Sequence, residues 1–270
     1  MKKTLLLMAL ICCMSAGLRA ESGTCGANLN WSFEGNTLTI TGSGAMTNYE
    51  SYNSSPWYSI RESIVQVSLP EELTTIGKNA FNSCTKLRLV TIPAKVTTIA
   101  NNAFDNCQVM SRVIFAQGST LQTIGEYAFT KCYALTSISL PSSLKTIKKA
   151  AFRNCNKLTS ITIPASCSSI EQDAFRECSE LSEVVLKEGV KTIASNVFTN
   201  CPNLTSVTLP NSLIAIGTEA FNGCSSLTHI TIPKNIKSIA DRTFVNCTSL
   251  ATISLPDSLT TIGYQAFYCS

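Results

Sequence analysis

Residues 158–180 read LTSITIPASCSSIEQDAFRECSE, and this stretch returns with small changes through most of the chain. Its phenylalanine, Phe175, has equivalents at a spacing of 23 residues that is interrupted once by a spacing of 25. The full set is Phe81, Phe104, Phe129, Phe152, Phe175, Phe198, Phe221, Phe244 and Phe267. A fixed period of this length indicates stacked structural units, each too small to bury a core alone.

Nine repeats follow from this spacing, and they begin at residues 64, 87, 110, 135, 158, 181, 204, 227 and 250. Repeat positions 1, 4, 6, 10 and 13 are apolar, position 7 is usually Pro, position 18 is Phe and position 21 is usually Cys. Aliphatic residues at fixed offsets within such a period are typical of leucine-rich repeats. We therefore predict a leucine-rich repeat solenoid over residues 64–270, a right-handed superhelix whose ninth repeat is truncated.

Each repeat predicts one strand and one compact turn. Positions 3 to 6, such as Ser160, Ile161, Thr162 and Ile163, alternate outward and inward and predict a short strand that ends before the Pro. Positions 14 to 21 carry Ala, Phe and Cys at helical or 3-10 spacing. The expected fold has a parallel β-sheet on one face and short helical turns on the other, stacked over about 45 Å.

The first 20 residues resemble a signal peptide, with Lys2 and Lys3 before an apolar run too short to span a bilayer. Export to the cell surface, the periplasm or the medium of a bacterium is therefore expected. Removing Lys2, Lys3 and Arg19 from the 21 basic residues leaves 18 against 17 acidic ones. A near-neutral chain lacks the electrostatic basis for binding nucleic acid or an anionic membrane, and no later stretch predicts a transmembrane segment.

Residues 21–63 precede the repeats and predict an N-terminal β-hairpin cap. Two alternating stretches, 29–33 and 37–40, flank a Gly35-Asn36 turn. This register pairs Phe33 with Leu38 and Trp31 with Ile40, so that one apolar face can cover the end of the solenoid. The aromatic residues that follow have two interpretations, a platform for stacking sugars or the completion of the cap: Tyr49, Tyr52, Trp57 and Tyr58.

The repeats resemble the BspA-like leucine-rich repeats of bacterial cell-surface and secreted proteins. Their pattern LxxIxIPxxVxxIgxxAFxxC is nearly intact in LTHITIPKNIKSIADRTFVNC at residues 227–247. Residues 28–32, 37–46 and the run Pro56-Trp57-Tyr58 are similar to the N-terminal cap of these proteins. The resemblance implies adhesion to host matrix proteins or to other cells, and it brings no ligand motif. The chain differs from larger members in showing no evident anchor or sorting domain.

Catalytic chemistry has little support in the sequence. The single histidine, His229, lies at an outward strand position, and no nucleophile elbow, phosphate loop or calcium loop is present. The pair Glu177 and Glu180 lies in a stretch of mixed charge without an expected cleft. We therefore expect a protein that is not an enzyme and needs no cofactor.

The cysteines allow three interpretations. Three of them, Cys25, Cys167 and Cys269, lie outside the repeat pattern. The other eight occupy position 21 of successive repeats and are Cys84, Cys107, Cys132, Cys155, Cys178, Cys201, Cys224 and Cys247. Disulfides are possible in an exported chain, but equivalent side chains on adjacent repeats point in parallel. A metal site would receive one ligand per repeat and no CxxC pair. We favour a reduced, buried column that packs as small apolar groups.

A non-enzymatic protein-binding surface is the leading functional prediction, with a host matrix or bacterial surface protein as partner. Most outward strand positions carry Ser or Thr, whereas Leu89, Arg112 and Ile114 combine apolar groups with an Arg, as interface hot spots do. The two-residue insertion in repeat 3, with Gln117 and Ser119, is expected to supply an adaptable rim. The alternatives are a glycan-binding module, or an envelope scaffold that self-associates.

Two further expectations concern contacts between repeats. Lys148 with Glu171, and Lys157 with Glu180, share repeat positions and are expected to form exposed ion pairs. Repeat 9 has no polar repeat after it, so self-association through its apolar residues is expected unless Tyr264 and Tyr268 cover them. These apolar residues are Leu250, Ile253, Leu255, Leu259, Ile262 and Phe267.

Overall fold

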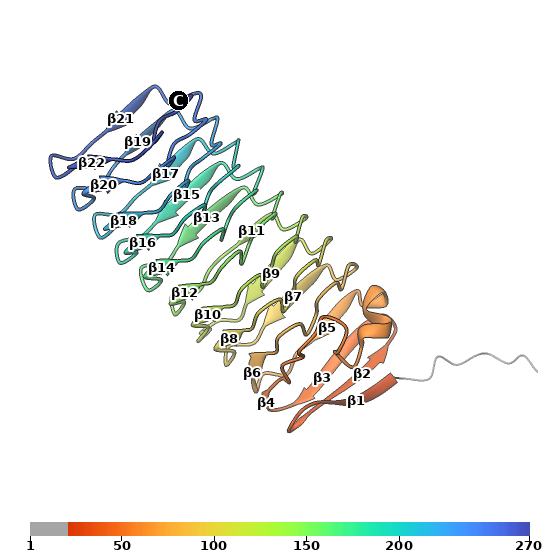
Figure 1. Cartoon of the computed structure of the whole chain (residues 1–270). Helices are drawn as coiled ribbons and strands as arrows, with labels where there is room; N and C mark the ends of the chain where they lie inside the picture. The colour runs from red at the N-terminus through yellow and green to blue at the C-terminus, as the bar shows by residue number, and fades with distance from the viewer. Residues whose placement is uncertain (1–20) are drawn as a thin grey trace, which may run out of the picture.

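The computed structural model describes residues 21–270 and shows a straight solenoid with two rows of short parallel strands and one row of turns (Figure 1). The expected signal peptide lies outside the described residues. The first strand row, called the front row, forms where positions 3 to 6 were predicted to be extended. Its strands are β5 (Gln66–Ser68), β7 (Leu89–Ile92), β9 (Arg112–Phe115), β11 (Ser137–Ile138), β13 (Ser160–Ile163), β15 (Glu183–Leu186), β17 (Ser206–Thr208), β19 (His229–Thr231) and β21 (Thr252–Ser254).

A second strand row, called the side row, was not predicted. In the repeats it forms at positions 12 and 13, where a Ser, Thr or Ala precedes an Ile that is buried in repeats 1 to 8, and β4 of the cap extends it. Its strands are β4 (Gly44–Ala45), β6 (Leu73–Ile76), β8 (Thr98–Ile99), β10 (Thr123–Ile124), β12 (Thr146–Ile147), β14 (Ser169–Ile170), β16 (Thr192–Ile193), β18 (Ala215–Ile216), β20 (Ser238–Ile239) and β22 (Thr261–Ile262).

The register between strands follows the sequence period. Ser160 pairs with Glu183 in the front row, and Thr146 pairs with Ser169 in the side row, each 23 residues apart. Equivalent repeat positions therefore lie side by side along the whole array. Because side chains alternate across a strand, position 4 and usually position 6 point inward, while positions 3 and 5 point to solvent.

The turn row corrects the expected helical or 3-10 turns, since the only helix of residues 21–270 is η1 (Tyr58–Ser63) in the cap. In every repeat, positions 16 and 20 adopt positive φ, as Asn79 at 57° and Ser83 at 58° do in repeat 1. A helix cannot contain such residues. Asn and Gly tolerate this conformation, and many of these positions carry one of them, including Asn102, Asn106, Asn154, Asn196, Asn200, Gly223 and Asn246.

Positive φ aligns three peptide groups of each turn along the solenoid axis. The N–H groups of Asn79, Phe81 and Ser83 donate to the carbonyls of Asn101, Ala103 and Asp105 in the next repeat at 2.8 to 3.0 Å. The same three bonds recur at every junction, up to the bonds from Arg242, Phe244 and Asn246 to repeat 9. The turn row is therefore a hydrogen-bonded ladder that runs the length of the array.

A column of aromatic rings fills the interior behind these turns. The nine Phe rings stack with centroids 5.1 to 5.7 Å apart, and eight of them, from Phe81 to Phe244, are fully buried. Trp57 continues the column beyond Phe81 at 5.6 Å. Each repeat thus buries a large ring against the ring of its neighbour, which provides much of the packing that a single repeat lacks.

The cap forms as predicted in its hairpin and is larger than predicted. β2 (Leu29–Glu34) and β3 (Thr37–Gly42) pair Trp31 with Ile40 and Phe33 with Leu38, which confirms the register. β1 (Glu21–Gly26) adds a third antiparallel strand, and β3 pairs in parallel with β5 of repeat 1. The cap sheet therefore continues into the front row, while β4 joins the side row by pairing with β6.

Candidate functional site

The outward side of the front row differs between its first repeats and the rest. Leu89 and Ile114 remain 43% and 38% exposed, and Arg112 is exposed between them. Register places Leu89 beside Arg112, and Ile114 lies two residues further along the same face. The structure thus brings these three predicted residues together, and residues 21–63 do not cover them.

The remaining front row offers small polar side chains at almost all outward positions. Ser137 is the register partner of Arg112, so the change of character occurs between repeats 3 and 4. Exceptions are Glu183 and the half-buried Val185 in repeat 6, and His229 in repeat 8. The other residues are Ser137, Ser139, Ser160, Thr162, Ser206, Thr208, Thr231, Thr252 and Ser254.

The insertion in repeat 3 forms a loop at the end of β9. Gly118 turns the chain with φ of 75°, and Ala116 and Thr120 donate backbone N–H groups to Ile92 and Ala94 of the preceding repeat. Gln117 lines a groove of about 570 Å³ with residues from all three repeats, whereas Ser119 does not. Its walls include Gln66, Ser68, Glu71, Glu72, Thr91 and Lys95. The loop is held by backbone hydrogen bonds at both ends, so it forms a fixed wall of the groove.

A second groove lies where the strands of the first repeats begin. It measures about 450 Å³ and is lined by Val65, Lys86, Arg88, Val109 and Ser111. Val109 is exposed, and no carboxylate belongs to the lining. Sequence reasoning missed these residues because they precede the strand. Register would have found them, since Lys86 and Val109 share a repeat position, as do Arg88 and Ser111.

The four aromatic residues proposed to stack sugars do not form one platform. Trp57 is fully buried, and its Nε1 donates to the carbonyl of Ala80 at 2.6 Å. Tyr49 is buried edge-on against Trp57. Both rings belong to the core of the cap and cannot face a ligand. Only Tyr52, 59% exposed, and the half-buried Tyr58 remain at the surface, with centroids 6.1 Å apart.

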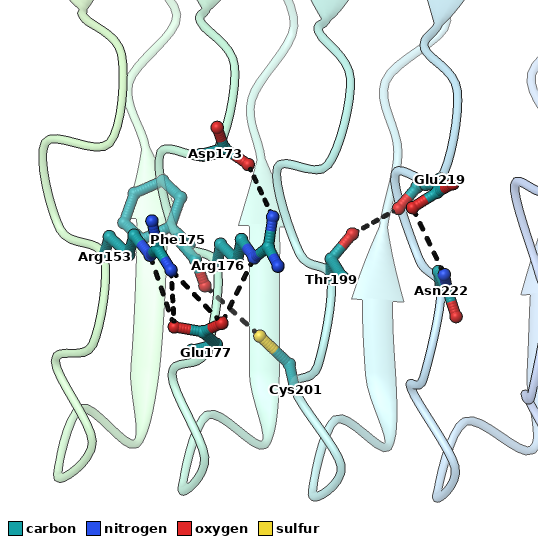
Figure 2. A network of polar contacts seen from close by, with 9 residues as sticks. All are labelled: Arg153, Asp173, Phe175, Arg176, Glu177, Thr199, Cys201, Glu219 and Asn222. Atoms are coloured by element: carbon teal, nitrogen blue, oxygen red, sulfur yellow. Dashed lines mark hydrogen bonds and ion pairs between the residues drawn. The ribbon is translucent and has the colours of Figure 1, made fainter.

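The turn row of repeats 4 to 7 carries a polar network (Figure 2). Arg153 and Arg176 both contact the carboxylate of Glu177 at 3.2 Å, and Arg176 also reaches Asp173 at 3.4 Å. Partial burial alone would raise the pKa of Glu177, but the hydrogen bonds and charge of Arg153 hold it below its usual value. Every charge in this cluster has a partner, so we assign it to joining repeats.

The expected ion pairs are confirmed in one case and wrong in the other. Lys157 and Glu180 form an ion pair across adjacent repeats. Glu171 instead accepts the backbone N–H of Lys149 at 3.1 Å, and no ion pair within 4 Å joins it to Lys148 in the described part of the chain. A carboxylate at position 14 is close to the backbone of the neighbouring turn, and this contact replaces the predicted one.

The cysteine column is buried as predicted. From repeat 2 onward, each position-21 thiol donates to the carbonyl of the stacked Phe in the preceding repeat, as Cys201 does to Phe175 at 3.3 Å (Figure 2). Burial raises the pKa of these thiols, to about 12 for Cys84, Cys201 and Cys247. Ser270 places a hydroxyl at the equivalent site and bonds to Phe244. The reduced state of the column stays a prediction, and its support is that each of the seven sulfurs from Cys107 to Cys247 has this partner.

Catalytic and metal-binding groups do not converge in the structure. His229 is exposed and contacts the hydroxyl of Thr228 at 3.3 Å. Within residues 21–270, no three side chains of His, Cys, Asp or Glu gather where they could hold a metal ion. Over the same residues, no helix has the length and apolar composition that crossing a membrane requires. The front row of repeats 1 to 3 is where exposed apolar side chains and an Arg interrupt the outward hydroxyl residues.

The two strand rows, the turn row and the period of 23 residues define a leucine-rich repeat solenoid. The sequence matches the BspA type leucine rich repeat region over residues 50–182, 111–228 and 145–270. The chain belongs to the BspA type leucine-rich repeat family, which confirms the resemblance drawn from its motifs.

Two solved structures share the fold over most of the chain. A leucine rich repeat protein of T. pallidum is 29% identical, with a TM-score of 0.59, over 76% of this chain and 91% of its own. A leucine rich cell surface protein of Faecalibacterium prausnitzii A2-165 is 27% identical, with a TM-score of 0.60, over 92% of this chain and 73% of its own. No curated protein matches the chain. Membership of the leucine-rich repeat family is consistent with a protein-interaction surface.

Proposed function

We propose that this protein is an exported, non-enzymatic adhesion protein that binds a host or cell-surface protein with the front row of its first repeats. The observation that carries the proposal is the contiguous exposure of Leu89, Arg112 and Ile114 on a row that elsewhere presents mostly small hydroxyl groups. Exposed apolar side chains around an Arg have the composition of interface hot spots. Gln117 and Ser119 of the adjoining loop complete the proposed contact surface.

Export and surface location are part of the same proposal. They rest on the signal-peptide pattern of residues 1–20 and on a structural relative described as a cell surface protein. Separating the culture of the producing bacterium into cytoplasm, envelope and medium tests this step. N-terminal sequencing of the recovered protein is expected to begin near Glu21, and intact protein confined to the cytoplasm would contradict export.

The binding site is tested by replacing Leu89, Arg112 and Ile114 together with Ser in the chain 21–270. Pull-downs from host matrix and envelope fractions are expected to lose their specific partner. The matched control replaces Ile214 and Lys237 with Ser, since both are exposed in repeats 7 and 8, away from this surface and from repeat 9. Circular dichroism must show that both variants are folded. Unchanged capture by the folded triple variant would move the site elsewhere.

A glycan-binding function is the second candidate, and the exposed Tyr52 beside Tyr58 favours it. Trp57 cannot report such binding because it is buried. Titration with oligosaccharides should therefore follow tyrosine fluorescence, with Tyr52→Ala as the control variant. If oligosaccharides cause no fluorescence change that is lost in the Tyr52→Ala variant, the glycan-binding function is refuted.

Self-association through repeat 9 is the third proposal. Ile262 is 53% exposed, and Leu255, Tyr264 and Tyr268 are exposed beside it, so the two tyrosines do not cover this edge. Sedimentation of the chain 21–270 is expected to show dimers or larger species at high concentration. Replacing Ile262 and Leu255 with Ser should shift them to monomer, whereas a wild-type chain that stays monomeric would refute the proposal.

A further inference from the structure

We propose that the front row of repeats 1 to 3 binds an extended polypeptide segment that carries carboxylates at one end and apolar side chains beyond them. This inference rests on the proposed protein-binding function and specifies the chemistry of the partner. The carboxylates would contact Lys86, Arg88 and Arg112, and the apolar side chains would pack on Leu89 and Ile114.

The cationic end of this surface is the groove at the strand starts. Lys86 and Arg88 are exposed, and they line the groove together with Val65 and Val109. Among residues 21–270, neither cation has a carboxylate within 4 Å, and the same holds for Arg112. Elsewhere in the described residues, Lys78, Lys95, Arg153, Lys157 and Arg176 each have such a partner, whereas single lysines such as Lys145 and Lys234 do not. What distinguishes Lys86, Arg88 and Arg112 is that three cations without an internal partner gather at one end of the exposed apolar side chains.

The apolar centre lies directly beside these cations. Arg88 precedes Leu89 in the chain, and Leu89 pairs in register with Arg112. Ile114 follows on the same face of β9, toward the groove that contains Gln117. A ligand that follows the strand direction would thus meet cations first and apolar groups next.

The opposite end of the surface has the opposite charge. The groove beyond the strands contains Glu71 and Glu72, of which Glu72 is paired with Lys95 and Glu71 has no partner in the described residues. The two grooves adjoin along the strands, since Val65 of the first is followed directly by Gln66 of the second. A uniformly anionic polymer that followed the strands would meet these carboxylates. Charge complementarity therefore favours a polypeptide with a short acidic end over nucleic acid or another polyanion.

The direct test is fluorescence anisotropy of the chain 21–270 with a labelled peptide that has two glutamates followed by alternating leucine and threonine. One control peptide replaces the glutamates with glutamine, and a second replaces the leucines with serine. We expect the acidic, leucine-bearing peptide to bind, with an affinity that falls as salt is raised. Each control peptide is expected to bind about tenfold more weakly, because each lacks one of the two contacts.

Variants locate the binding and separate this inference from the proposed function. Lys86→Gln with Arg88→Gln should weaken the acidic peptide about tenfold, while Lys234→Gln with Lys237→Gln, at exposed positions of repeat 8, should not. Inorganic polyphosphate tests whether any polyanion binds. It is expected not to displace the acidic peptide when added at an equal concentration of negative charge. Equal binding of the acidic and glutamine peptides, absence of peptide binding, or efficient competition by polyphosphate would each overturn the inference. If partner capture still depends on Leu89 and Ile114 in that case, the proposed function stands alone.

Discussion

The turn row and the front row belong to the same repeats but differ in how much they vary. In the turn row, every repeat places a Phe ring in one column and donates the same three backbone hydrogen bonds to the next repeat, up to repeat 9. The outward positions of the front row include Leu, Arg, Ile, Glu and His among the hydroxyl residues. Packing between neighbouring repeats determines the residues of the turn row, whereas it does not constrain the outward residues of the front row. The departures from the repeat on which the proposed function rests therefore lie on the front row and directly beside it.

Alkaline pH is expected to produce the largest change in the free energy of unfolding, because it acts on the buried cysteines. The thiols ionise near pH 9 when unfolded, whereas burial raises the pKa of Cys84 to about 12 and of Cys167 to about 11. The folded state keeps protons that the unfolded state loses. Stability is therefore full below pH 9 and falls between about pH 9 and pH 12, by about 1.4 kcal/mol per pH unit for each such cysteine. Chemical denaturation across this range measures the slope.

Cys167→Val is the matched control for this slope, since Cys167 occupies position 10, where the other repeats carry Leu, Val or Ile. The variant should reduce the pH dependence of the unfolding free energy by the contribution of one cysteine, and it should leave stability at pH 7 nearly unchanged. A wild-type slope near zero, or a count of free thiols far below eleven in the denatured chain, would show that the column is cross-linked.

Phe175→Ala should cost about 3–5 kcal/mol of unfolding free energy, because it empties one fully buried position between two stacked rings. Ser160→Ala, at an outward front-row position of the same repeat, should change it by less than about 0.5 kcal/mol. Urea denaturation of both variants measures the contrast. Similar losses in the two variants would erase the distinction between the rows.

Trp57→Phe tests whether the cap completes the turn row. The substitution keeps an aromatic ring on Phe81 but removes the Nε1 donor, so the buried carbonyl of Ala80 loses its partner. The expected loss is about 1–3 kcal/mol. Tyr58→Phe, which keeps the neighbouring ring and removes only a hydroxyl at a half-buried position, is the control. A loss no greater than that of the control would show that the indole hydrogen bond is dispensable.

Ala150→Gly should stabilise the protein by up to about 1 kcal/mol. Ala150 occupies position 16 with φ of 53°, a conformation that costs an alanine more than a glycine. The greater freedom of glycine in the unfolded chain offsets part of the gain. Ala151→Gly, at the adjacent buried position without positive φ, should destabilise instead. If thermal denaturation shows Ala151→Gly to be more stable than Ala150→Gly, the positive φ at position 16 does not limit stability.

Lys157→Ala should have the smallest effect, about 0–1 kcal/mol, because its ion pair with Glu180 is exposed to water. The difference from wild type should shrink as salt is raised. Arg153→Ala, whose partner Glu177 is more buried, should cost more. Equal effects that do not depend on salt would indicate lost packing rather than lost charge.

The repeat period could predict the fold because each register pair is one period apart. Ser160 and Glu183, for example, follow directly from counting. The turn row could not be assigned correctly from apolar spacing, since Ala, Phe and Cys at helical offsets also fit a ladder of left-handed turns. The signal that distinguishes the two is the recurrence of Asn at positions 16 and 20, as in Asn102 and Asn106.

The candidate site could be predicted only in part. Leu89, Arg112 and Ile114 were identifiable because they depart from the hydroxyl residues of their columns. Lys86 and Arg88 were not, because a cation before a strand is unremarkable until the register places it beside Val109. The burial of Trp57 also required the structure, since the sequence does not show that its ring extends the Phe column.

The aligned peptide groups of the turn row also give the molecule a dipole moment along the solenoid axis. Each of the three hydrogen-bond chains has its N–H groups pointing toward the later repeats, so the peptide dipoles add along the axis as they do in a helix. At the negative end, the N–H of Tyr49 and the indole of Trp57 donate to the terminal carbonyls of Lys78 and Ala80. At repeat 9, the N–H groups of Gln265, Phe267 and Cys269 form the positive end. The solenoid therefore acts as a rod-shaped macrodipole, and an electric field should orient it with repeat 9 toward the negative electrode.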